Sequence, residues 1–165
     1  MRPVMENTLI RKTGQNVKFD SLILMRYGLK VEGILFDTMI AAHLLKPESR
    51  SLKLETLSLD YLNYQMIPIQ DLIGKGKDQI SMAEVDVDKI SFYACEDADI
   101  ALQLTLIFEK KLKEENLSKF FNEVEIPLLS VLIIQENSNS PELFKEYPEN
   151  AKLPSDVCII FSGKS

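Results

Sequence analysis

Two short strand-like segments near the start of the sequence, each followed by helical spacing, restrict the fold class most. Leu9 to Thr13 has the character of a short strand stopped by Gly14, and Ile34-Leu35-Phe36 is a second brief run after Gly33. Short apolar runs bounded by glycine are typical of buried parallel strands. Most of the remaining chain has helical patterns. The sequence therefore predicts an α/β fold with more helix than sheet.

Helical spacing of apolar residues dominates the rest of the chain. Gly28 ends the first such segment and Pro47 the second, as these residues commonly do at helix ends. Residues 1–8 carry no periodic pattern, and Ile67–Lys77 is rich in turns with one short helical piece. The predicted helices are Val17–Tyr27, Asp37 or Thr38 to Leu45, Leu52–Tyr61, a long one from Asp86 or Asp88 to Glu115, and Leu117–Gln135 with an interruption at Pro127.

Composition and linker residues divide the chain into a domain and a tail. The 165 residues, 45% of them hydrophobic, suffice for one globular domain with its own core. The segment Asn137-Ser138-Asn139-Ser140-Pro141 has a linker composition. We predict a domain over residues 1–135 and a poorly ordered tail over 136–165, in which Val157 to Phe161 would form an orphan strand.

The charge of the chain excludes one class of nucleic-acid-binding protein. A formal net charge of -6 argues against a broad basic surface, although an acidic site that holds a few nucleotides through metal ions remains open. No segment is apolar enough to span a membrane, and no signal-peptide pattern opens the sequence. Cys95 and Cys158 lack the spacing of a zinc knuckle and suit a reducing compartment. We expect a cytoplasmic protein.

Two segments place polar groups at helical spacing. Gly14-Gln15-Asn16-Val17-Lys18-Phe19-Asp20 puts a carboxylate one turn after an amide, and Tyr93 and Asp97 project from one helix face. Taken singly, these residues are ordinary. Asn16 is a common type of residue at a helix cap, and Asp20 is common in the first turn of a helix. Tyr93 and Asp97 are ordinary residues of an amphipathic helix. The spacing within and between the segments carries more information.

Together, these segments resemble the second and third motifs of the DEDDy 3′–5′ exonucleases, in the branch of bacterial DNA polymerase I. The first is similar to Asn-x-x-x-Phe-Asp and the second to Tyr-x-x-x-Asp. The resemblance covers residues 10 to 134 and implies a truncated ribonuclease H-like exonuclease fold. Other segments that match in the family's order are Leu35–Met39, Ile73–Lys77, Asp97–Asp99 and Glu123–Leu128.

The resemblance implies catalytic roles for three residues. Asp97 would bind the cation that activates water, Tyr93 would point that water at the terminal phosphodiester, and Asp20 would hold a second cation. Hard oxygen ligands suit Mg²⁺ or Mn²⁺. The implied activity is removal of nucleotides from a DNA 3′ end, which is the proofreading reaction.

The same resemblance implies a substrate and partners. Gln15 and Asn16 would seat the last nucleotides of a single-stranded DNA 3′ end. Lys75 and Lys77 flank a glycine and either contact the phosphate backbone or lie in a solvated turn. The polymerase portion of such a protein is an expected partner.

One family motif, Asp-x-Glu on the first strand, has no counterpart here. Met1 to Thr13 contains a single acidic residue, Glu6, and Phe36-Asp37-Thr38-Met39 is a decoy with methionine where glutamate is needed. We expect weak metal affinity and an unpaired sheet edge at Leu9–Thr13. A truncated or frame-shifted gene would explain this departure, and a missing amino-terminal segment would then be a further partner.

Two alternatives to the proofreading exonuclease stay open. The first is a catalytically dead remnant that binds single-stranded nucleic acid or a partner. The second is a ribonuclease D-like enzyme that acts on RNA. The exonuclease hypothesis requires the carboxylates of Asp20 and Asp97 to face a common groove, with oxygens within roughly 5–8 Å across a two-cation pocket.

Overall fold

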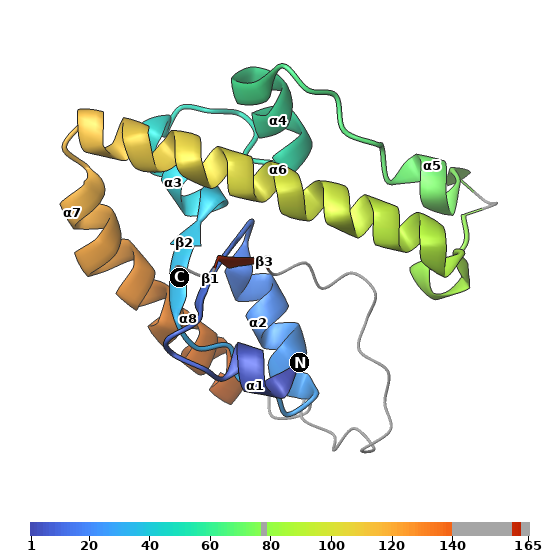
Figure 1. The fold of residues 1–165 in the computed structure, drawn as a ribbon, viewed down its shortest axis with the longest axis horizontal. Helices are drawn as coiled ribbons and strands as arrows, with labels where there is room; N and C mark the ends of the chain where they lie inside the picture. Colours follow the sequence, from blue (N-terminus) through green and yellow to red (C-terminus); the bar gives the residue numbers. More distant parts are fainter. Residues whose placement is uncertain (77–78, 140–159, 163–165) are drawn as a thin grey trace.

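The computed structural model describes residues 1–76, 79–139 and 160–162. Figure 1 shows a small sheet in the middle of the molecule and a long helix, α6 (Val87–Glu114), that runs along one side. In the described part of the chain, no helix is long and apolar enough to cross a membrane. The fold is a helix-rich α/β arrangement, and this part of the prediction is confirmed.

The central strand of the sheet is β1 (Arg11–Gly14). It pairs in parallel with β2 (Ile34–Asp37) and antiparallel with β3 (Ile160–Ser162). The first two strands form close to where the sequence predicts them. Two other expectations are wrong: β1 is not an unpaired edge, and the carboxyl-terminal strand is not an orphan, because these two strands pair with each other.

The helix α2 (Val17–Arg26) connects the two parallel strands. Gly33, which precedes β2, has a φ of +72°, and a Cβ there would lie 2.8 Å from the carbonyl oxygen of Ile10. Its own carbonyl accepts a hydrogen bond of 3.0 Å from the backbone N–H of Lys12. Glycine is required here because the backbone of β2 approaches that of β1 too closely for a side chain.

The largest apolar core lies between the sheet and three helices, α3 (Thr38–Leu45), α4 (Leu54–Leu62) and α6. These helices begin or end within about three residues of their predicted bounds, a common error at helix ends. Phe108 of α6 is fully buried, and its ring meets that of Tyr61 edge to face at 4.8 Å. The buried members of this core are Phe36, Ala41, Ala42, Leu57, Met66, Ile100, Leu104, Phe108, Leu112 and Phe121.

Further helices precede and follow α6 along the chain (Figure 1). Near its start are α5 (Gln70–Ile73) and the 3-10 turn η2 (Met82–Glu84), and after its end come α7 (Ser118–Phe120), η3 (Phe121–Glu125) and α8 (Ile126–Asn139). The predicted interruption at Pro127 takes the form of a π-helical turn, η3, directly before it. The helix α8 continues beyond residue 135; the rest of the predicted tail, except β3, lies outside the described residues.

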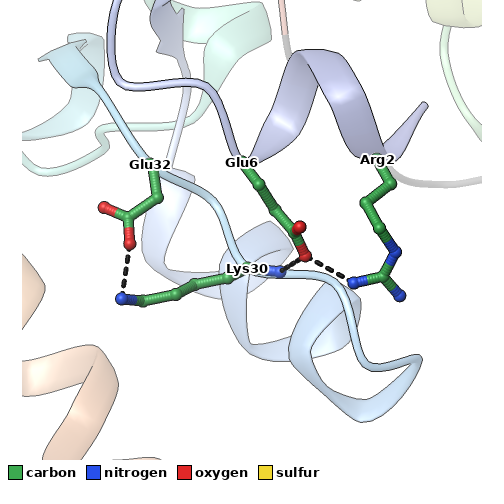
Figure 2. Close-up of polar contacts among 4 residues, drawn as sticks. All are labelled: Arg2, Glu6, Lys30 and Glu32. Carbon is green, nitrogen blue, oxygen red and sulfur yellow. Dashed lines mark hydrogen bonds and ion pairs between the residues drawn. The ribbon is translucent and has the colours of Figure 1, made fainter.

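The helix α1 (Arg2–Met5) was not predicted, since residues 1–8 show no periodicity. Met5 is only 2% exposed and packs with Leu24, Leu29 and Val31. Figure 2 shows Glu6 accepting hydrogen bonds from the Arg2 guanidinium at 2.6 Å and from the backbone N–H of Lys30 at 3.3 Å. Burial of one apolar side chain therefore orders a segment too short to show a sequence pattern.

Candidate functional site

The turn between β1 and α2 carries the first predicted motif. Asn16 adopts the left-handed conformation, with φ 55° and ψ 49°, and its side chain makes no capping hydrogen bond to α2. Asparagine tolerates this conformation better than most residues, but at some energetic cost. The interpretation of Asn16 as an ordinary N-cap is therefore wrong, and other groups must hold the start of α2.

Asp37, at the end of β2, supplies that support. Its carboxylate accepts hydrogen bonds from the backbone N–H of Asn16 at 3.2 Å and of Val17 at 2.7 Å. It also accepts from the N–H of Met39 at 2.9 Å and of Ile40 at 3.3 Å, which caps α3. Burial raises the pKa of Asp37, and the four backbone N–H groups act in the opposite direction. One buried carboxylate thus joins the starts of two helices.

The amide of Gln15 is engaged inside the protein. Its Nε2 donates to the carbonyl of Leu52 at 2.7 Å, and its Oε1 is hydrogen-bonded to the hydroxyl of Thr38. That hydroxyl also lies 3.1 Å from the carbonyl oxygen of Gly14. In this arrangement Gln15 fixes the turn, and the predicted contact with nucleotides would have to compete with these bonds.

Asp20 lies in the first turn of α2 and is only 6% exposed. A solvated surface carboxylate would be largely exposed, so that ordinary interpretation does not hold. Burial of a carboxylate is costly unless other groups stabilise its charge. The buried position is consistent with a structural or functional requirement for the charge at this point.

Tyr93 and Asp97 are both half-buried on α6. Burial, followed by the negative charges of Glu55 and Glu96, raises the pKa of Asp97 to about 7. Glu96 itself accepts hydrogen bonds from the Tyr64 hydroxyl at 2.7 Å and from a backbone N–H at 2.9 Å. The surroundings of Asp97 are therefore acidic, which would favour a cation or a proton at this carboxylate.

A buried pair of hydroxyls fastens the two motif-bearing parts together. The hydroxyl of Thr13 in β1 lies 2.8 Å from that of Thr105 in α6. Since the Thr105 hydroxyl donates its proton to the carbonyl of Ala101, Thr13 must be the donor of the pair. The strand that leads to Asn16 is thus tied to the helix that carries Asp97. A common groove between Asp20 and Asp97 stays a prediction.

The two predicted phosphate-contacting lysines belong to the loop after α5. Lys75 is exposed there, and Lys77 lies outside the described residues. Figure 1 shows α5 beside the amino-terminal end of α6, away from the sheet. The loop is therefore separated from the turn at Asn16, and its role in binding stays a prediction.

A site for two divalent cations needs more ligands than two aspartates provide. Among the residues that the structure describes, no three histidine, cysteine, aspartate or glutamate side chains gather closely enough to hold a metal ion. Glu6 does not supply a missing ligand, because it accepts a hydrogen bond from the backbone N–H of Lys30, which follows the end of α2. Asp20 lies in the first turn of α2, at the opposite end of that helix. The described residues alone do not form the implied two-cation site.

Sequence reasoning missed two residues that shape this region. Asp37 was dismissed as a decoy apart from its capping of α3, although its place between a strand and a helix was a signal for a wider capping role. Glu55, in the first turn of α4, had no signal, since only packing of α4 on α6 brings its charge near Asp97.

Comparisons with known proteins agree with the family resemblance of the sequence. The family model described as 3'-5' exonuclease matches residues 1–113. Curated relatives named DNA polymerase I include those of Borreliella burgdorferi, 40% identical over 81% of this chain, and of Chloroflexus aurantiacus, 39% identical over 82%. That of Rhizobium leguminosarum is 33% identical over 82% of the chain. The matched segment spans only 13% to 14% of the length of these relatives.

Proposed function

This chain belongs to the 3'-5' exonuclease family, and we propose that it acts on the 3′ end of a DNA strand as part of a protein of the DNA polymerase I type. The observation that carries the proposal is the family match over residues 1–113, which contains both motif segments. The parallel pair β1–β2 with its connecting helix supports a ribonuclease H-like arrangement.

The proposed reaction is hydrolysis of the terminal phosphodiester, in which water attacks phosphorus and the 3′-oxygen leaves. Tyr93 would hydrogen-bond the attacking water, and Asp97 would lie beside it one helical turn away. Asp20 would face the leaving oxygen, and Asn16 would contact the last nucleotide. The buried position of Asp20 and the acidic surroundings of Asp97 support these roles.

The family is generally dependent on divalent cations, and Mg²⁺ or Mn²⁺ suits carboxylate ligands. Because the described residues do not form a site for two cations, we assign no step of the reaction to a metal. A second candidate function needs no such site. The chain would then bind a single-stranded 3′ end without cleaving it.

A nuclease assay separates the two functions. A 5′-labelled single-stranded DNA is incubated with the protein and Mg²⁺ or Mn²⁺, and shortening from the 3′ end is followed, with RNA of the same sequence as the comparison. Cleavage that is lost in Asp97→Asn and Asp20→Asn supports hydrolysis. Asp99→Asn is the matched control, because Asp99 is exposed on α6 and bonded to Gln103.

Three other results would redirect the proposal. Binding of the labelled DNA without shortening supports the second candidate. Preferential cleavage of RNA supports a ribonuclease D-like activity. A protein that neither binds nor cleaves either strand contradicts both candidate functions.

A further inference from the structure

Two adjacent residues, Asp37 and Thr38, hold a turn that belongs to another part of the chain. The carboxylate of Asp37 binds the backbone N–H groups of Asn16 and Val17, and the hydroxyl of Thr38 contacts the carbonyl of Gly14 at 3.1 Å. We call residues 14–17 the clamped turn, and Asp37 and Thr38 its clamp. Asp37 and Thr38 are 1% and 0% exposed, so water does not compete for these bonds.

The clamp holds the start of α2 without help from the Asn16 side chain. An asparagine at the start of a helix usually caps the helix with its own side chain. Asn16 makes no such bond, and its left-handed backbone departs from the extended conformation usual at a cap. Asp37 instead accepts the N–H groups of Asn16 and Val17, which a cap side chain does not serve. The amide of Asn16 takes no part in capping, and the Asn16 backbone is held in a left-handed conformation that only fixed surroundings maintain.

The direction of α2 depends on the same bonds. Asp20 lies one turn after Asn16, so a change in the backbone at Asn16 and Val17 rotates or shifts the Asp20 carboxylate with the helix. Gly14 pairs with Asp37 in the parallel sheet. This pairing fixes the distance between the Asp37 carboxylate and the backbone N–H groups of Asn16 and Val17. Small displacements of a reacting group are costly in catalysis.

We propose that Asp37 is a positioning residue that aims the Asn16 amide and the Asp20 carboxylate at the 3′ end of the strand. This inference rests on the proposed function. Within the described residues, the hydrogen bonds of the Asp37 carboxylate all come from backbone N–H groups, and Asp37 is buried. It therefore acts through Asn16 and Asp20 and not on the substrate.

The variant Asp37→Ser tests the proposal with little risk to the fold. Serine caps helices about as well as aspartate, so the bonds to Met39 and Ile40 at the start of α3 are retained. Its side chain is too short to reach Asn16 and Val17 as well. Amide hydrogen exchange should therefore accelerate at Asn16 and Val17 while it stays slow at Ile40.

The functional measurement is a double-mutant cycle of Asp37→Ser and Asn16→Ala on kcat/KM, or on the Kd for a single-stranded oligonucleotide when the protein binds without cleaving. Each single variant should lose about tenfold or more, and the double variant should lose no more than the worse single variant, because both act through one group. Asp86→Ser, at the exposed N-cap of α6, is the matched control and should stay within twofold of the wild type.

The outcomes separate this inference from the proposed function. An Asp37→Ser protein with faster exchange at Val17 but unchanged cleavage and binding overturns the positioning role alone. Losses that add fully in the double variant also overturn it, because they indicate independent effects. A wild-type protein that neither cleaves nor binds removes the proposed function, and the positioning role with it.

Discussion

Asp37 is buried and Asp97 is half-buried, and the groups around the two carboxylates differ in a way that separates their roles. Four backbone N–H groups point at the carboxylate of Asp37. Asp97 instead has the negative charges of Glu55 and Glu96 as neighbours. Donors stabilise an anion and like charges oppose it. Asp37 is therefore suited to act as a structural anion, whereas a cation or a proton would stabilise the carboxylate of Asp97.

The first prediction concerns the pH dependence of stability at Asp97. Its pKa rises from 3.8 to about 7 on folding, so the folded protein binds a proton more tightly than the unfolded chain. The contribution of Asp97 to stability is therefore fullest below pH 3.8 and is lost as the pH rises to about 7. Asp97→Asn should stabilise the protein at pH 8 by roughly 1–2 kcal/mol, after allowance for solvent screening.

Urea unfolding at several pH values between 5 and 8 measures this difference. The gap between Asp97→Asn and the wild type should widen with pH and level off above about 7. Glu55→Gln removes one of the charges that raise the pKa of Asp97. In a Glu55→Gln background, the difference in stability that Asp97→Asn causes should therefore be smaller. A gap that is constant across this range contradicts an elevated pKa at Asp97.

At the scale of elements, the fold depends on a few contacts between segments that are far apart in the sequence. The hydroxyls of Thr13 and Thr105 tie β1 to α6, and Met5 anchors α1 on the segment after α2. The bounds of α2, α3, α4 and α6 were predictable because each has its own periodicity or end signal. The contacts that dock them had no local signal, because they depend on residues brought together by folding.

The second prediction concerns the hydroxyl pair. Thr105→Val keeps the shape of the side chain but leaves the buried Thr13 hydroxyl without its acceptor, which should cost roughly 1–3 kcal/mol. Thr105→Ser retains the acceptor and is the conservative control. The double variant Thr13→Val with Thr105→Val should recover part of the loss. Urea unfolding checks all three, and equal stability of Thr105→Val and the wild type would refute the argument.

The third prediction concerns α1. Met5→Ala removes the buried anchor of this helix, and we expect a loss of about 2 kcal/mol, at the lower end for buried methionine because the cluster is small. Met1 is 62% exposed, so Met1→Ala should change the free energy of unfolding by less than about 0.5 kcal/mol. Chemical denaturation compares the two. Equal effects would show that α1 does not dock through Met5.

At the scale of the whole molecule, the sheet joins the two ends of the described chain. The strand β3 lies antiparallel to β1 and occupies the side of β1 opposite β2. Figure 1 shows this three-stranded sheet between α6 on one side and α2 and α8 on the other. A strand in this position satisfies backbone groups that would otherwise form an open edge.

The fourth prediction follows from this pairing. Deletion of residues 160–165 uncovers one side of β1, and exposed strand edges pair with other chains. We expect the shortened protein to self-associate as its concentration rises, whereas the intact chain does so much less. Size-exclusion chromatography with light scattering measures the mass of each. Identical masses at every concentration would contradict a protective role for β3.

The sequence by itself determined the α/β class, most helices and the two motif segments, because periodicity, glycine and proline act over a few neighbouring residues. It also predicts which side chains carry the chemistry, and those roles stay a prediction. Only the tertiary structure decided that Asp37 supports the turn at Asn16, that Glu55 raises the pKa of Asp97, and that β3 covers β1. These relations join distant segments, and their energies arise from burial and hydrogen bonding that exist only after the chain has folded.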